Sequence, residues 1–300
     1  MDNLLIVVVG PTAVGKTAIS IKLAENYNTE IVSADARQCY REMTIGTAKP
    51  SPEELATVKH HFVDTYTIHK ELSAGKFELE ALETIRLIHE KGPYCVMTGG
   101  SGLYVQAVCD GFDPMPKVDP QVRQQLNQQY AEHGLTSLLE KLRAIDPIYY
   151  EQVDKENPQR VIRGLEVHLA TGKAYSEYRA GDKVQRPFST VKIGLHMERE
   201  LLYQRIEKRV DRMIEEGLFE EARPLYPFRT LNALQTVGYK ELFGYFEGSY
   251  DRDEAIRLLK RNTRRYAKRQ LTWFRKDTDV VWFQPEEGDQ IIAFVNELAS

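Results

Sequence analysis

A glycine-rich segment near the start of the chain constrains its fold more than any other feature. Residues 10–17 read GPTAVGKT and directly follow the apolar run Leu4–Val9. The pattern G-x-x-x-x-G-K-[ST] after a strand predicts a loop whose backbone N–H groups turn toward phosphate oxygens, with a lysine charge and a hydroxyl that can ligate Mg²⁺. The helix that begins there directs its positive dipole end at the anion. We therefore expect a diphosphate group against Gly10, Pro11, Thr12, Ala13, Val14, Gly15, Lys16 and Thr17, with Thr17 as the Mg²⁺ ligand.

Strand-like and helix-like segments alternate through the first third of the chain. An alternation of this kind is typical of a parallel sheet that has helices on both faces. The expected order is strand, helix, strand, helix, strand and then a further helix after Gly102; the first five segments are Leu4–Val9, Lys16–Asn26, Glu30–Ala34, Ser73–Lys91 and Tyr94–Thr98.

The pattern changes at residues 113–116, which read DPMP, and no strand is credible from Asp119 to about Ala170. Helices are expected there, the last with Asn157 as its cap and Pro158 in its first turn; they are Gln121–Ala131, Thr136–Ala144 and Gln159–Thr171. Alternation then returns with Thr190–His196, Glu198–Glu216, Arg252–Lys276, Val280–Phe283 and Gln290–Leu298. We expect an α/β protein: a P-loop NTPase-like parallel sheet core with helices on both faces (residues 1–113 and 187–300) and an inserted all-helical subdomain (114–186).

Composition excludes several classes of protein. The three cysteines, Cys39, Cys95 and Cys109, form no C-x-x-C pair, which argues against a disulfide framework or a cysteine zinc site and suits a reducing cytoplasm. No apolar run approaches the roughly 20 residues that span a bilayer, so no membrane partner is expected. The apolar stretch Leu4–Val9 is too short for a signal peptide and lacks a basic flank.

A phosphate-binding loop does not by itself name a reaction. A kinase or GTPase needs a second carboxylate after an apolar strand, but the strand Tyr94–Thr98 leads into Gly99 and Gly100. Asp35 follows the second strand, on the same rim of the sheet as the loop. A carboxylate there can ligate Mg²⁺ or act as a general base. The structural alternative is a helix cap for residues 36–43.

One helical segment near the end of the chain is strongly basic. From Glu254 to Lys276 there are nine Lys or Arg residues and one acid, so the segment carries +8 and the rest of the −4 chain carries −12. Helical spacing gathers the cations on one half of the helix and the apolar residues on the other. This asymmetry indicates a polyanionic partner. A solvated helix face remains the alternative, and a membrane surface fits less well because the apolar half resembles core.

Three smaller features each allow a structural and a functional interpretation. The neighbours His60 and His61 project differently, so a structural role is favoured over a metal pair. Cys39 lies near Asp35 but has no visible activating base. Trp273 and Phe274 could stack on a nucleic-acid base, although core packing is favoured for Phe274.

The chain resembles the bacterial tRNA dimethylallyltransferases, also called tRNA isopentenyltransferases, nearly from end to end. The resemblance rests on GPTAVGKT (10–17), SADARQCY (33–40), IGTAKP (45–50), HHFVD (60–64), TGGSGLYVQA (98–107), NPQRVIRGLEV (157–167), RIEKRVDRMIEEGLFEE (205–221), QTVGYKE (235–241) and KRQLTWFRK (268–276). It implies transfer of a dimethylallyl group from dimethylallyl diphosphate to the N6 amine of the adenosine 3′-adjacent to the anticodon, giving N6-isopentenyladenosine. The implied partners are dimethylallyl diphosphate, Mg²⁺ and the tRNA anticodon stem-loop, which the helical insertion would contact, and a monomer is expected.

The resemblance also implies roles for individual residues. Asp35 matches the general base, Ser101 lies where the family usually has Thr near the bond that breaks, and Arg209 matches an arginine that holds the departing diphosphate. Matches to tRNA-contacting positions are Asp35, Ala36, Arg37, Gln38, Arg123, Gln159, Arg160, Val161, Ile162, Arg163, Gln235, Gly238, Tyr239, Lys240, Lys268, Arg269, Gln270, Trp273 and Arg275. Ala36 departs from the family, which commonly has Ser there. Two other functions stay open: a small-molecule kinase that uses ATP, and an RNA-binding protein with a regulatory phosphate-binding loop.

Overall fold

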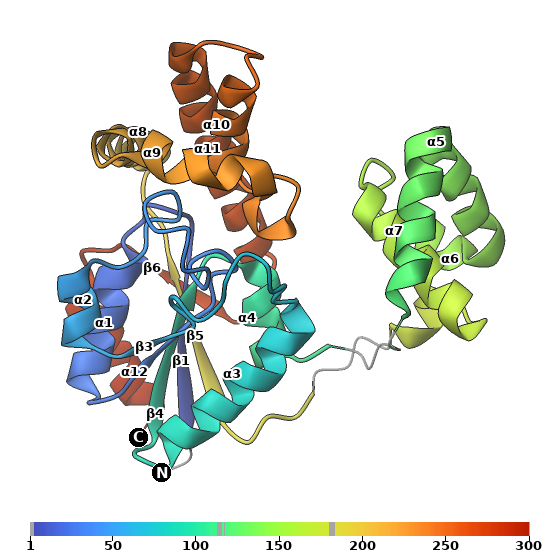
Figure 1. Cartoon of the computed structure of the whole chain (residues 1–300). Helices are drawn as coiled ribbons and strands as arrows, with labels where there is room; N and C mark the ends of the chain where they lie inside the picture. Colours follow the sequence, from blue (N-terminus) through green and yellow to red (C-terminus); the bar gives the residue numbers. More distant parts are fainter. Residues whose placement is uncertain (1–2, 113–115, 117, 180–183, 300) are drawn as a thin grey trace. The chain divides into compact units, whose positions relative to one another are not determined.

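The computed structural model describes residues 3–112, 116, 118–179 and 184–299 and divides into two compact units, each described separately below (Figure 1). The core unit comprises Met1–Cys109 and Arg186–Ser300, and the helical unit comprises Asp110–Gln185. The helical unit begins four residues before the expected insertion at 114 and ends one residue before its expected end at 186. Most of the DPMP segment that suggested this boundary lies outside the described residues.

A six-stranded parallel sheet forms the centre of the core unit, in the order β3-β2-β4-β1-β5-β6. Its strands are β1 (Leu4–Val9), β2 (Ile31–Ser33), β3 (His60–His61), β4 (Tyr94–Gly99), β5 (Ser189–Leu195) and β6 (Val280–Phe283). Every strand pair is parallel, so all carboxyl ends meet at one edge. The expected parallel α/β core is confirmed; β3, only two residues long, has no periodic signal in the sequence and was not expected.

Helices cover both faces of the sheet because side chains of a strand alternate between its faces (Figure 1). Ile6 and Val8 of β1 pack with residues of α1 (Lys16–Asn26) and α12 (Gly288–Ala299). Leu5 and Val7 belong to a separate cluster with α3 (Ala74–His89) and α4 (Gly102–Cys109). The remaining short helix of this region is α2 (Pro52–Thr57), whose Ser51 and Glu54 form a capping box. The buried sheet fixes the loops at its edge.

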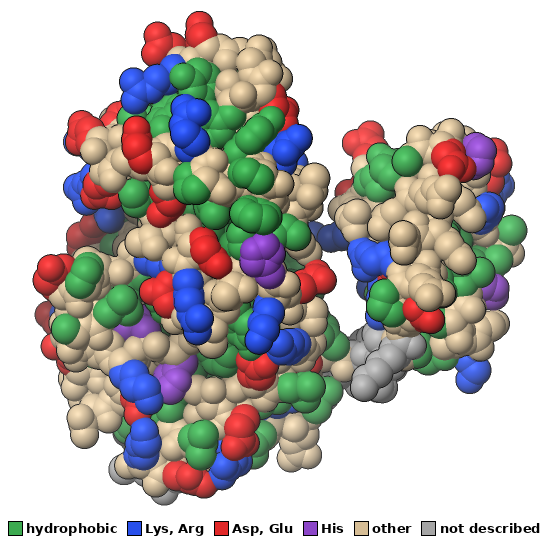
Figure 2. Space-filling model, in the orientation of Figure 1, with side chains coloured by type: hydrophobic (Ala, Val, Ile, Leu, Met, Phe, Trp, Pro, Cys, Tyr) green, Lys and Arg blue, Asp and Glu red, His purple; other side chains and the backbone are tan. Residues whose placement is uncertain are grey.

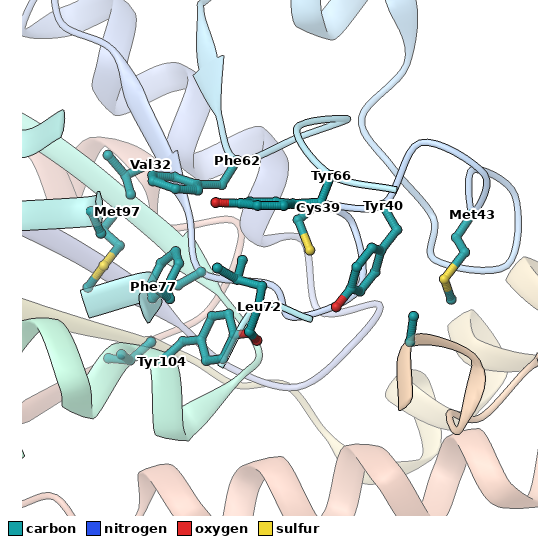
Figure 3. Close-up of a cluster of buried hydrophobic side chains, with 14 of the residues drawn as sticks. Val32, Cys39, Tyr40, Met43, Phe62, Tyr66, Leu72, Phe77, Met97 and Tyr104 are labelled. Atoms are coloured by element: carbon teal, nitrogen blue, oxygen red, sulfur yellow. The ribbon is translucent and has the colours of Figure 1, made fainter. Parts of the chain in front are cut away.

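Aromatic packing anchors the segment that follows β2 (Figure 3). Phe77 stacks on Tyr104 with ring centroids 4.4 Å apart and meets Phe62 edge-on at 5.1 Å. Cys39, from the turns after Asp35, is fully buried in the same cluster. Burial, with the charge of Asp35, raises the pKa of the Cys39 thiol to about 12, which disfavours the thiolate that a nucleophile requires. The packing instead fixes the course of the chain just after Asp35.

Four helices of the core unit lie together beyond the sheet, at the top of Figure 1. They are α8 (Arg199–Glu215), α9 (Leu218–Ala222), α10 (Tyr239–Phe246) and α11 (Arg252–Phe274), with the 3₁₀ turns η2 (Arg223–Phe228) and η3 (Asn232–Leu234) between them. The long helices α8 and α11 were expected within a few residues of these bounds. The short elements between them were not, because fewer than three helical turns give a weak periodic pattern.

The helical unit has its own hydrophobic core, which includes Leu126, Leu138, Leu142 and Val161. Its helices are α5 (Pro120–Ile145), α6 (Pro147–Gln152), α7 (Pro158–Thr171) and the 3₁₀ turn η1 (Tyr175–Tyr178). Gly134 (φ 73°, ψ −179°) interrupts α5, which agrees with two expected helices. The Asn157 side chain caps α7, Pro158 lies in its first turn, and Gly172 ends it in the left-handed conformation, as the sequence predicted.

Charges on the outside of the core unit are mixed. On the face drawn in Figure 2, Lys and Arg side chains are interspersed with Asp and Glu. A concentration of one sign therefore has to be sought on particular helices rather than over this whole face. Within the part of the chain that the structure describes, no helix is both long enough and apolar enough to cross a membrane.

Candidate active site

A cavity of about 400 Å³ opens at the carboxyl edge of the sheet, within the core unit. Its lining comes from the glycine-rich loop, the ends of β2 and β4, the segment before α2, and α8. The lining residues are Thr12, Ala13, Gly15, Lys16, Thr17, Ser33, Asp35, Gln38, Thr47, Ala48, Pro50, His60, Thr98, Gly99, Arg205, Lys208, Arg209 and Arg212. The predicted loop, Asp35 and Arg209 therefore share one cavity. Sequence reasoning missed Arg205, Lys208 and Arg212.

The loop has a conformation that only glycine accepts at two positions. Gly10 has φ +148°, and a Cβ there would lie 2.7 Å from the carbonyl oxygen of Leu195. Gly15 has φ +113° and precedes the first residue of α1. No side chain caps α1, so its first N–H groups remain available to a ligand. This is the backbone arrangement that binds phosphate.

The Lys16 ammonium lies inside the loop. Its Nζ donates to the carbonyl oxygens of Gly10 at 3.0 Å and Pro11 at 2.8 Å. Burial lowers the pKa of Lys16 to about 8; the charge of Asp35 raises it and that of Arg209 lowers it further. A buried ammonium of this kind is stabilised when an anion binds beside it.

Arg209 joins α8 to the loop, because its Nη2 donates to the Thr12 hydroxyl at 2.6 Å. Burial lowers the pKa of Arg209, while the charges of Asp35 and Tyr266 act in the opposite direction. Tyr266, on α11, was not expected at the site. The two enclosed cations, Lys16 and Arg209, provide fixed positive charge where a leaving diphosphate needs it.

Asp35 has one carboxylate oxygen occupied and one available. Its Oδ1 accepts the N–H groups of Arg37 at 2.9 Å and Gln38 at 3.3 Å. Residues 36–43 form turns, so the alternative of a helix cap is wrong in its helix, although Asp35 does cap a turn. Its Oδ2 has no hydrogen bond to any residue that the structure describes. That oxygen is free to accept a proton in the cavity.

Ser101 holds the Asp35 segment to the loop after β4. Its hydroxyl accepts the Ala36 N–H at 2.9 Å, and its own N–H donates to the Ala34 carbonyl oxygen at 3.3 Å. Ser101 is not among the residues that line the cavity. Its contact is with the backbone of Ala36, so this bond does not depend on the side chain that replaces the family's usual Ser.

Gln270 contradicts the prediction of an RNA contact. Its side chain is 6% exposed: Oε1 accepts the Thr12 N–H at 2.8 Å, and Nε2 donates to the Gly100 carbonyl oxygen at 2.9 Å. A Cβ on Gly100 would lie 2.1 Å from that Nε2. Gln270 therefore clamps the glycine-rich loop to the loop after β4. Position on the helix alone did not reveal this role.

Four further predictions of RNA contact are wrong, because the side chain or the backbone of the residue is buried. Val161 and Ile162 are 0% exposed in the core of the helical unit. Tyr239 is also 0% exposed and donates to Glu221, and Gly238 before it is buried. The predicted contacts that are exposed are Arg123, Gln159, Arg160, Gln235, Lys240, Lys268, Arg269, Trp273 and Arg275; Asp35, Ala36, Arg37, Gln38 and Arg163 are partly exposed.

In the helical unit, three of the predicted RNA-contacting residues lie in one cluster around a buried carboxylate. Glu166 is 2% exposed and pairs with Arg123 at 3.3 Å and Arg163 at 3.4 Å. Arg123 also donates to the Gln159 side-chain oxygen at 2.6 Å. The cluster holds two guanidinium groups in place while leaving them partly exposed.

Some of the cations of α11 are paired with acids. Arg257 pairs with Glu254, Lys260 with Asp211 and Arg264 with Glu207. The expected cationic face is therefore partly neutralised. A hollow follows along the helix, lined by Arg265, Lys268, Arg269, Thr272, Trp273 and Lys276. Trp273 is 37% exposed, whereas Phe274 is buried as expected.

His60 has a structural contact and lines the cavity. Its Nδ1 lies 2.8 Å from the Val58 carbonyl oxygen, whereas the neighbouring His61 bonds to Glu30 instead. Burial lowers the pKa of His60. The two rings have different partners, and among the described residues no group of three or more His, Cys, Asp or Glu side chains could hold a metal ion.

Comparison with known proteins agrees with this site. Residues 38–277 match the family described as IPP transferase. The chain is 49% identical to the tRNA dimethylallyltransferase of Cytophaga hutchinsonii, covering 98% of this chain and 97% of that one. It is 50% identical to that of Christiangramia forsetii, covering 97% of each.

Solved structures also resemble it, among them one bacterial and one eukaryotic transferase. The full-length tRNA isopentenylpyrophosphate transferase from Bacillus halodurans has a TM-score of 0.74 and 41% identity, covering 99% of this chain and 96% of that one. A eukaryotic dimethylallyltransferase acting on tRNA has a TM-score of 0.79 and 27% identity, covering 95% of this chain and 74% of that one. The family match spans most of the sequence, starts three residues after Asp35, and includes α8 and α11. This chain therefore belongs to the IPP transferase family.

Proposed function

We propose that this protein transfers a dimethylallyl group from dimethylallyl diphosphate to the N6 amine of the adenosine 3′-adjacent to the anticodon of tRNA. The observation that carries the proposal is the cavity at the sheet edge, where the Asp35 carboxylate faces the same space as Lys16, Arg209 and the glycine-rich loop. A base beside an anion-binding loop is what alkylation of an amine by a diphosphate ester requires. The reading as a transferase rather than a kinase also explains the lack of a carboxylate after β4.

The residues divide the chemistry between them. An adenine amine is a poor nucleophile, so loss of its proton must accompany attack, and the free Oδ2 of Asp35 accepts that proton. The carbon–oxygen bond of the donor breaks as the carbon–nitrogen bond forms, and the diphosphate leaves with the electron pair. The loop amides, Lys16 and Arg209 stabilise the charge that develops on it.

The residues present fit a magnesium ion. Thr17, Ser33 and Asp35, which carry oxygen ligands, all line the cavity. Mg²⁺ commonly takes one or two protein oxygens, and phosphate oxygens and water complete its shell. Thr17 would hold the ion, which would supply further positive charge to the diphosphate.

Recognition of tRNA is assigned to the exposed cations of α11 and of the helical unit. Cations on a helix bind the phosphates of an RNA without reading its sequence. The adenosine has to leave the stacked anticodon loop before its amine can reach Asp35. A tRNA substrate fits a cytoplasmic enzyme, and we propose that the protein acts there as a monomer.

The test is a direct assay with a competing nucleotide. The protein is incubated with unmodified tRNA and dimethylallyl diphosphate, and isopentenyladenosine is followed by mass spectrometry. Calorimetry with dimethylallyl diphosphate and ATP, side by side, identifies the ligand of the loop. Product formation with preferential binding of the allylic donor supports the proposal; tight ATP binding with hydrolysis and no modified tRNA would establish a kinase or a regulatory loop instead.

Replacing both Lys268 and Arg269 by Gln is expected to weaken tRNA binding and flatten its salt dependence. Each lost phosphate contact lowers the slope of log affinity against log salt by roughly 0.7 to 0.9. Donor affinity stays unchanged because neither residue lines the cavity. Arg257→Gln on the same helix is the control, since Arg257 is paired with Glu254. A salt slope equal to the parent's would assign Lys268 and Arg269 to an ordinary solvated face.

A further inference from the structure

Helix α8 presents a row of four cations to the cavity. The row has the helical pattern i, i+3, i+4, i+7, which places its members on one side of the helix. All four line the cavity: Arg205, Lys208, Arg209 and Arg212. The acids between them point elsewhere: Glu207 pairs with Arg264 and Asp211 pairs with Lys260, both on α11. The charges of α8 are thus separated, with cations toward the cavity and acids toward the neighbouring helix.

Three members of the row have no protein partner that accounts for their charge. Arg209 is tied to Thr12. Arg205, Lys208 and Arg212 are exposed and form no ion pair with any acid that the structure describes. Arg205 lies beside the loop, since its Nη2 is 3.7 Å from the position of a Cβ on Gly15. Among the described residues, five Lys and Arg side chains line the cavity against a single acid, Asp35, and this excess of positive charge indicates an anionic ligand.

The allylic donor does not require all of them. A diphosphate ester carries about three negative charges, and the loop amides, Lys16 and Arg209 already face it. We propose that Arg205, Lys208 and Arg212 form a second anion subsite, which binds a backbone phosphate of the RNA next to the adenosine that is alkylated. This inference rests on the proposed function, because it takes the acceptor to be an RNA.

The acceptor itself brings such a phosphate to the row. A base is joined to its 5′ and 3′ phosphates through a single ribose, so an adenine that reaches Asp35 carries both phosphates to the mouth of the same cavity. The three side chains are exposed at that mouth rather than enclosed like Lys16, which suits a phosphodiester on a large substrate. Their contact would hold the extruded nucleotide and offset the loss of its stacking.

The experiment combines protein and RNA substitutions. Arg212→Gln and Lys208→Gln are made singly, with Arg86→Gln as control, because Arg86 is exposed on α3 and paired with Glu83 and Glu90. Binding of an anticodon stem-loop RNA is measured with normal linkages and with an uncharged methylphosphonate at the 5′ or the 3′ phosphate of the target adenosine. Dimethylallyl diphosphate affinity is measured for each protein.

At least one α8 variant is expected to lose about tenfold in RNA affinity, the effect of a charge-assisted hydrogen bond, with donor affinity within about twofold of the parent. A methylphosphonate at one of the two positions is expected to weaken RNA binding by the parent and control proteins. The same methylphosphonate is expected to weaken RNA binding by that variant little further, because the variant has already lost the contact. If the protein substitution and the methylphosphonate weaken RNA binding independently, so that their effects multiply, the proposal is overturned. It is also overturned if neither methylphosphonate weakens RNA binding by the parent. Loss of donor affinity with RNA affinity unchanged would assign the row to the donor. Failure of the parent to modify tRNA at all would instead refute the proposed function.

Discussion

Replacement of Asp35 by Asn is expected to lower the rate of tRNA prenylation by at least about 10²-fold, the lower end of the contribution of a general base. The amide keeps the shape of the side chain, and its oxygen can still accept the N–H groups of Arg37 and Gln38, so the turn after β2 should form normally. The variant is therefore expected to fold and to bind dimethylallyl diphosphate. Single-turnover rates with tRNA measure the loss.

A magnesium series separates the three roles open to Asp35. A general base gives a loss of rate that extra Mg²⁺ does not restore and that leaves donor affinity unchanged. A metal ligand gives a loss that Mg²⁺ largely rescues, together with weaker donor binding. A residue that only caps the turn gives near-parental activity, which would refute the assignment of Asp35 as the base.

Replacement of Lys16 by Met is expected to lower kcat/KM for the donor by about 10²–10³-fold, the typical effect of removing one group that stabilises charge in the transition state. Met has a similar length but no charge, so the packing inside the loop should persist. The control is Lys22→Met, on the same helix, because Lys22 is exposed and paired with Asp289. Steady-state kinetics at varied donor concentration measure the effect. Equal kinetics of the two variants would remove Lys16 from the site.

Lys16 should also make donor binding sensitive to pH. With a pKa of about 8 before an anion binds, Lys16 loses its proton as pH rises through that value, so donor affinity should fall above pH 8. A bound diphosphate favours the charged form and raises the pKa, so binding near pH 8 takes up a proton. Calorimetry in two buffers of different ionisation enthalpy detects this uptake. Lys16→Met should abolish it, and its persistence in that variant would contradict the explanation.

Local sequence signals, which act within a few residues of one another, determined much of the secondary structure and domain organisation of this protein. The glycine-rich loop between β1 and α1 followed from its glycines, its lysine and the apolar run before it. The cap at Asn157, the proline after it and the glycine at 172 marked α7 correctly, because they satisfy or interrupt hydrogen bonds of that helix alone. The return of alternating strands after residue 187 revealed the inserted helical unit.

The surroundings of each side chain were decided only by tertiary structure. Helical spacing shows which residues share a face, but not what that face meets. Gln270 lies within a basic stretch, yet it turns into the core and joins two loops that are far apart in sequence. Val161 and Ile162 lie between an exposed and a partly exposed arginine and are nevertheless buried.

Tertiary structure also decides which cations remain without an acidic partner. The sequence identified α11 as basic, but two of the acids that pair with its cations, Glu207 and Asp211, belong to α8, some 50 residues earlier in the chain. Those same pairings leave Arg205, Lys208 and Arg212 facing the cavity. The charges along a helix can therefore be read from the sequence. Whether a charged side chain pairs with another side chain or remains available to a ligand depends on which helices the fold brings together.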